Sequence, residues 1–90
     1  MPDDEYERLQ HHLVAYPEAG DLITGSGGLR KIRWKEKHRG KRGGIRIIYY
    51  WWHPNTIFML YPYRKSETAD LTRDQIRVLK NVVKEWLNER

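Results

Sequence analysis

The sequence contains no cysteine, which excludes disulfide bonds and thiolate metal sites. It has no long apolar run, so we expect no membrane-spanning helix, and its first residues lack the pattern of a secretory signal. Internal repeats and low-complexity tracts are also absent. The chain must therefore fold without covalent cross-links, and we expect no membrane partner.

The residues that are present predict one small domain over 1–90. Apolar residues make up 39% and aromatics 12%, including four Trp and six Tyr, which is more core material than a disordered chain carries. Ninety residues do not accommodate a second core. A domain of this size is only marginally stable, so a bound partner would add to its stability.

Positive charge is concentrated in one segment. Residues 30–46 contain one acid, Glu36, and nine bases: Arg30, Lys31, Arg33, Lys35, Lys37, Arg39, Lys41, Arg42 and Arg46. The whole chain carries only +5, so the remaining residues are net acidic. Such a block indicates a polyanionic partner, either nucleic acid or an acidic protein segment. The alternative is a solvated basic loop without a partner.

Hydrophobic spacing predicts a helix near each end of the chain. Between about residues 3 and 16, apolar residues recur every three or four positions: Tyr6, Leu9, Leu13 and Tyr16. A second helix is expected over about residues 73–88, because Thr72 is a good N-cap and Gln75, three residues later, completes a capping box.

Three strands are expected between the helices. The segments LRKIRW (29–34), IRIIYYWW (45–52) and TIFMLYPYRK (56–65) are rich in β-branched and aromatic residues, and a polar, glycine-bearing loop joins the first two. Pro62 cannot donate to a β-ladder, so the third strand should end there or lie at an edge. We predict an α+β fold in which both helices cover one face of a small antiparallel sheet.

The other face of this sheet is the candidate functional surface, and we expect it to be open to solvent. Alternation along the strands places three basic residues on it, and three more candidate residues follow Pro62 at the end of the third strand: Lys31, Arg33 and Arg46, then Tyr63, Arg64 and Lys65. Cations bind phosphates and an aromatic ring stacks on a base, so this arrangement suits a nucleic-acid strand.

Purely structural roles are the alternatives. Tyr63 can pack on the last helix, Lys65 can be solvated, and Arg46 can pair with an acid such as Asp70. Lys31 and Arg33 are as readily surface charges as RNA contacts. The histidines are scattered along the chain, which disfavours a metal site or a catalytic histidine, and we expect no cofactor: His11, His12, His38 and His53.

Three segments resemble toxins of bacterial type II toxin–antitoxin systems, in the RelE/ParE superfamily and nearest its HigB-like branch. They are PEAGDLITGSGGLRKIRW, GKRGGIRIIYYW and YPYRKSETADLT, and the similarity extends over about residues 17–80. The branch shows Gly-Gly-Leu-Arg-Lys, Gly-Gly-Ile/Val-Arg and Tyr-x-Lys-x-Glu-x-x-Asp-Leu-Thr/Ser patterns, and its order of elements matches. One such motif alone is weak evidence, whereas the three together are specific.

The resemblance implies a ribosome-dependent endoribonuclease, an mRNA interferase that needs no metal. Such toxins enter the ribosomal A site and cut messenger RNA, with a ribose 2′-hydroxyl attacking the neighbouring phosphate.

The resemblance also implies which residues act. The implied catalytic residues are Arg46, Tyr63 and Lys65, and the expected RNA-binding residues are Lys31, Arg33, Lys41, Arg42 and Arg64.

This chemistry needs a base for the 2′-hydroxyl, positive charge against the phosphorane and an acid for the 5′-oxygen. Arg46 supplies a fixed fork for phosphate oxygens. Lys65 can donate the proton or stabilise charge. Tyr63 can stack a base, orient the hydroxyl, or act as a base if neighbouring cations lower its pKa. The residues alone do not select among these roles.

The resemblance also implies partners: messenger and ribosomal RNA, and a cognate helix-turn-helix, HigA-like antitoxin through which the pair binds DNA in the bacterial cytoplasm.

Members of the family usually begin with a strand before the first helix, and this sequence lacks that strand. The predicted sheet then has an unpaired edge that an oligomer would cover. Two other functions stay open: a non-enzymatic, ParE-like gyrase inhibitor and an inactive RNA-binding remnant.

Overall fold

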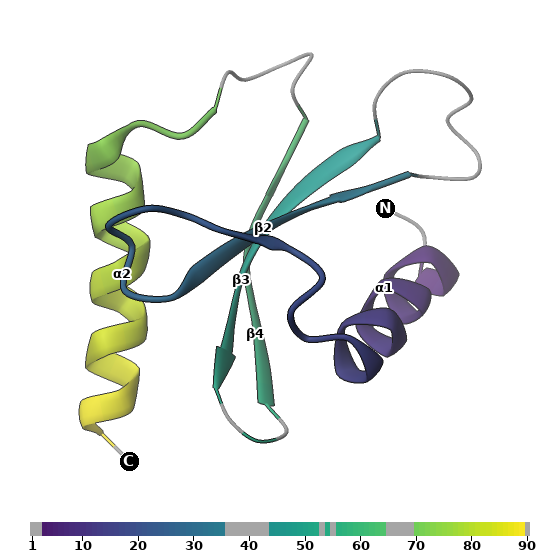
Figure 1. Cartoon of the computed structure of the whole chain (residues 1–90), viewed down its shortest axis with the longest axis horizontal. Coiled ribbons are helices and arrows are strands. Elements are labelled where there is room, and N and C mark those ends of the chain that lie inside the picture. Colours follow the sequence, from purple (N-terminus) through teal and green to yellow (C-terminus); the bar gives the residue numbers. More distant parts are fainter. Residues whose placement is uncertain (1–2, 36–43, 53, 55, 65–69, 90) are drawn as a thin grey trace.

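The computed structural model describes residues 3–35, 44–52, 54, 56–64 and 70–89. Helix α1 spans Asp3–Ala15, helix α2 spans Arg73–Asn88, and four strands lie between them: β1 (Asp21–Leu22), β2 (Leu29–Trp34), β3 (Ile45–Trp52) and β4 (Thr56–Tyr63). The strands form one antiparallel sheet in chain order, with β4 at an edge as Pro62 predicted (Figure 1). The α+β prediction is confirmed. Among the described residues the sheet has four strands rather than the three expected, because the two-residue β1 pairs with β2.

The two helices lie on opposite faces of the sheet, which runs between them in Figure 1. Residues of α1 share a core cluster with Ile32 and Ile47, and residues of α2 share one with Leu29 and Ile48. The prediction that both helices cover one face is therefore wrong. The reason lies in β3, where the neighbours Ile47 and Ile48 point to opposite faces and both are apolar, so each face needs a covering layer.

Helix α1 buries a different stripe from the predicted one. Leu9 and Leu13 are fully buried as expected, but Tyr6 is 40% and Tyr16 63% exposed. The third buried residue is Glu5, whose carboxylate accepts a hydrogen bond from an indole of β2 at 3.4 Å. These buried residues recur every four positions along one side of the helix. Hydrophobicity could not select Glu5, because its side chain is charged.

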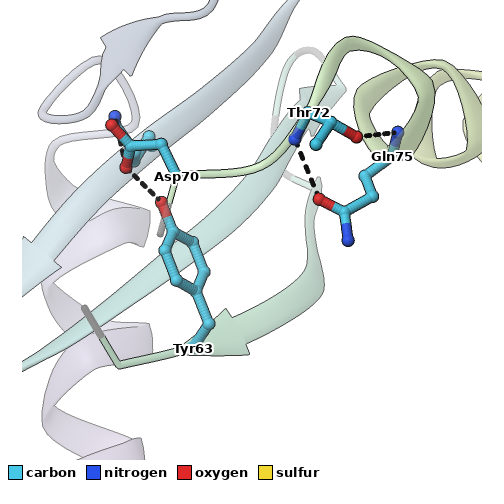
Figure 2. A network of polar contacts seen from close by, with 5 residues as sticks. Tyr63, Asp70, Thr72 and Gln75 are labelled. Carbon is cyan, nitrogen blue, oxygen red and sulfur yellow. Dashed lines mark hydrogen bonds and ion pairs between the residues drawn. The ribbon is translucent and has the colours of Figure 1, made fainter. Parts of the chain in front are cut away.

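Helix α2 begins where the sequence predicts. The Gln75 amide donates a hydrogen bond to Thr72 Oγ1 at 3.1 Å, and the Thr72 amide donates one to Gln75 Oε1 at 2.8 Å (Figure 2). This reciprocal pair satisfies two amides that the first turn otherwise leaves unpaired. The helix turns Val83 into the core and leaves Val78 and Val82 exposed.

Strands β2 and β3 form a hairpin that needs a glycine next to its last pair. Trp34 pairs with Ile45, and Gly44 has a φ of +67°. A Cβ on Gly44 would lie 2.2 Å from the Trp34 carbonyl oxygen, so only glycine fits. The glycine thus lets the chain turn into the central strand. The predicted loop residues Lys41 and Arg42 lie outside the described residues.

Candidate functional site

Three predicted site residues stand side by side across the sheet. Arg46 of β3 is directly opposite Arg33 of β2 on one side and Tyr63 of β4 on the other. Directly opposed residues of antiparallel strands point to the same face, and Lys31, two residues before Arg33, points there too. We call Lys31, Arg33, Arg46 and Tyr63 the site cluster.

The face that carries the site cluster is only partly open to solvent. Helix α2 packs on this same face, and Tyr63 belongs to a core cluster that includes Val83. Arg46 and Tyr63 are 7% and 6% exposed, whereas Lys31 is partly exposed and Arg33 is exposed. The expectation of an open face is therefore wrong for Arg46 and Tyr63. Packing of Tyr63 in the core under the last helix, one of the structural alternatives, is observed.

Asp70, just ahead of α2, joins the site cluster. Its Oδ1 accepts a hydrogen bond from the Tyr63 hydroxyl at 3.2 Å (Figure 2). The same oxygen lies 3.5 Å from the Lys31 ammonium nitrogen. The Asp70 side chain is 63% exposed. From sequence, Asp70 is a candidate partner for Arg46 alone, and its contacts with Lys31 and Tyr63 are not predicted. Two signals were available in the sequence: Asp70 is the Asp of the Tyr-x-Lys-x-Glu-x-x-Asp-Leu-Thr/Ser pattern, and it lies two residues before the N-cap Thr72.

The electrostatics of the site keep Tyr63 protonated. The hydrogen bond from Tyr63 and the charge of Lys31 lower the pKa of Asp70, and Arg46 contributes further. Burial raises the pKa of Tyr63, and the hydrogen bond to Asp70 and the Asp70 charge raise it further, against an opposing effect of Arg46. Tyr63 is therefore a hydrogen-bond donor at neutral pH. The role of general base, which needs a lowered pKa, does not fit this arrangement.

Arg46 carries a donor that the described part of the chain leaves unsatisfied. Its side chain is buried, and Nη1 has no hydrogen-bond partner among the described residues. A buried guanidinium is costly unless its charge and its N–H groups are paired. Within the described residues, the site thus contains a buried cation whose Nη1 is free to donate a hydrogen bond, and this cation lies between Arg33 and Tyr63 across the sheet.

The other predicted residues are not part of the site cluster. Arg64 follows β4, is half-buried and has contacts of its own. Lys65, Lys41 and Arg42 lie outside the described residues. His12 packs against an aromatic ring of β2 on the α1 side of the sheet. In the described parts of the chain, no three metal-ligating side chains gather, and no helix is long and apolar enough to cross a membrane.

A family match covers the sheet and α2 together. A model described as the RelE toxin of the RelE/RelB toxin–antitoxin system matches residues 18–90. The match begins after α1 and contains all four strands, α2 and every residue of the site cluster. It does not distinguish the HigB-like branch from the rest of the family. The chain belongs to the RelE toxin family, the toxins of RelE/RelB toxin–antitoxin systems.

Proposed function

We propose that this RelE-family toxin is a ribosome-dependent endoribonuclease that cuts messenger RNA in the ribosomal A site. The observation that carries the proposal is Arg46, a buried guanidinium inside a strand, beside Arg33 and with Nη1 unpaired in the described chain. A group this costly to bury is typical of a functional site. The matching ligand is a phosphate, whose oxygens accept hydrogen bonds from the planar guanidinium.

In the proposed reaction the ribose 2′-hydroxyl loses its proton to solvent water, and its oxygen attacks the adjacent phosphorus. The bond to the 5′-oxygen of the next nucleotide breaks, that oxygen leaves as a protonated hydroxyl, and a 2′,3′-cyclic phosphate forms. Arg46 donates hydrogen bonds to the non-bridging oxygens as negative charge grows on the phosphorane, and Lys31 adds positive charge. Tyr63, which is protonated, donates a hydrogen bond to a phosphate oxygen. Lys65, outside the described residues, is the proposed proton donor to the leaving 5′-oxygen.

The remaining basic residues are proposed to hold RNA. Arg33 is exposed beside Arg46, so it can contact the messenger backbone next to the scissile phosphate. Lys41, Arg42 and Arg64 are proposed to bind messenger or ribosomal RNA backbone. Contacts of this kind add affinity and fix position, with little dependence on base sequence.

Family membership implies a cognate antitoxin as the partner. We propose an antitoxin of the helix-turn-helix, HigA-like class that neutralises the toxin by covering the site cluster and supplies the DNA contacts of the pair. The motifs on which this class rests are those of the HigB-like branch. The proposed location is the bacterial cytoplasm, where ribosomes, messenger and antitoxin are all present.

Translating ribosomes programmed with a defined message provide the test. Addition of the purified protein should produce cuts in codon register, mapped by primer extension, and the same message without ribosomes should stay intact. Absence of cuts, or equal cutting of the naked message, contradicts the proposal. Relaxed plasmid accumulating with gyrase would instead indicate a ParE-like inhibitor, and RNA binding without either activity an inactive remnant.

A further inference from the structure

The carboxylate of Asp70 lies in an anion position within the site. Its Oδ1 contacts the Tyr63 hydroxyl at 3.2 Å and the Lys31 ammonium at 3.5 Å. The Arg46 charge also reaches this carboxylate, because it contributes to the lowered pKa of Asp70. The Asp70 carboxylate is thus stabilised by the positive charges of Lys31 and Arg46 and by a hydrogen bond from the Tyr63 hydroxyl.

These contacts are the ones that a phosphate oxygen would make. A carboxylate and a phosphate are both oxyanions, and both accept charge-assisted hydrogen bonds from ammonium and hydroxyl groups. A phosphate at the site cluster would therefore need the same two donors, Lys31 and Tyr63. The two anions would also repel each other if both stayed in place.

The surroundings of Asp70 allow its side chain to leave. The side chain is 63% exposed, so rotation about its χ angles can carry the carboxylate into solvent. The backbone nearby is held separately by the capping box between Thr72 and Gln75. Movement of the carboxylate therefore needs no change in α2.

We propose that Asp70 is an internal substitute for the RNA phosphate: in the free protein its carboxylate holds Lys31 and Tyr63, and a bound phosphate takes over both donors and displaces it. The proposal rests on the proposed function for the identity of the anion as RNA phosphate. It assigns Asp70 a competing role rather than a catalytic one.

Competition of this kind has a measurable consequence. The apparent affinity for an external anion is reduced by the fraction of molecules in which the carboxylate occupies the donors. An exposed ion pair of ordinary strength corresponds to about a two- to five-fold reduction. Asp70→Asn removes the competing charge, so inorganic phosphate should bind the full-length variant about two- to five-fold more tightly than wild type.

The experiment is a titration with inorganic phosphate at constant ionic strength, followed by the NMR resonances of Tyr63 and of the Asp70 carboxyl carbon. Asp74→Asn is the matched control, because Asp74 is also an exposed acid but pairs with Arg77 on α2. We expect tighter binding in Asp70→Asn and wild-type affinity in Asp74→Asn. In wild type, the Asp70 carboxyl resonance should move toward that of a solvated aspartate, with the same midpoint as phosphate binding.

Three results would overturn the proposal. One is equal or weaker phosphate binding by folded Asp70→Asn, which would make Asp70 a positioning residue. The second is the same gain in Asp74→Asn, which would reduce the effect to net charge. The third is a lack of phosphate binding in every variant. No ribosome takes part in this titration, so its outcome is independent of whether the ribosomal cleavage assay succeeds.

Discussion

The Tyr49 hydroxyl accepts a hydrogen bond from the Gly20 amide at 2.9 Å, so the middle of β3 holds the turn that follows α1. The same hydroxyl donates to the Pro17 carbonyl at 2.7 Å. A Cβ on Gly20 would lie 2.8 Å from the Tyr49 ring and 2.9 Å from the Lys31 carbonyl oxygen, so the close approach requires glycine. This contact fixes where the chain enters β1. Strand β2, which pairs with β1, carries Lys31 and Arg33.

Tyr49→Phe should lower the free energy of unfolding by about 1–2 kcal/mol, because it leaves a buried amide and a carbonyl without their partner. Urea denaturation followed by tryptophan fluorescence measures the change. Tyr50→Phe is the control, since Tyr50 is half-buried on the opposite face of the same strand and should change stability much less. Equal effects of the two substitutions would count against the assigned role of the Tyr49 hydroxyl.

Thr72→Ala should destabilise the protein by about 1 kcal/mol through loss of the N-cap of α2. The change removes the acceptor of the Gln75 amide and leaves that amide to solvent. Thermal or urea unfolding gives the value. Thr24→Ala, in an exposed loop, serves as the matched control and should lie within experimental error of wild type. A wild-type stability for Thr72→Ala would show that the cap adds nothing.

Asp70→Asn should lower the pKa of Tyr63 without restoring the ordinary value of 10.0, because burial, the largest cause of the rise, remains. The folded state binds the Tyr63 proton more tightly than the unfolded state does. Its contribution to stability is therefore present below pH 10.0 and is lost as the pH rises through the folded pKa. Phenolate absorbance measures the titration. In wild type and in Asp70→Asn, subtracting the absorbance of the same protein with Tyr63→Phe isolates the signal of Tyr63.

Tyr49 supplies an internal reference for that titration. Burial also raises its pKa, but Asp70 is not among the causes, so Asp70→Asn should leave the Tyr49 titration unchanged. An unaltered Tyr63 pKa in Asp70→Asn would mean that the hydrogen bond and charge of Asp70 do not act on the phenol.

Sequence signals contained within one element predicted that element well. The β-branched and aromatic run of β3 and the capping box of α2 gave bounds that the structure reproduces, Ile45–Trp52 and Arg73–Asn88. The strand β1 was not predicted, because Asp21–Leu22 has no pattern of its own and becomes a strand only by pairing with β2. Such pairing is a tertiary contact, which local propensity does not report.

The placement of the helices is likewise a tertiary feature that local sequence signals do not report. The apolar stripe of α2 indicates that one side of the helix is buried, but it does not indicate which face of the sheet the helix packs on. Consecutive buried residues in β3, Ile47 and Ile48, were the available sign that both faces carry a layer. For the site, the alternation of side chains along a strand predicted that Arg33 and Arg46 lie on the same face of the sheet, and this prediction is confirmed. The burial of Arg46 and the contacts of Asp70 with Lys31 and Tyr63 are tertiary contacts, which the periodicity of a single strand does not report.

The central claim is that Arg46 is retained for phosphate chemistry at the expense of stability, and ribosome-dependent cleavage by Arg46→Met tests it most directly. Methionine keeps most of the apolar volume and removes the Nη1 donor, which has no hydrogen-bond partner among the described residues, so the free energy of unfolding should stay the same or rise. Arg77→Met removes the same charge from the exposed side of α2 and should cleave like wild type. A folded Arg46→Met protein should cut programmed ribosomes about 100- to 1,000-fold more slowly than wild type. Codon-register cleavage by that folded variant at the wild-type rate would contradict the account.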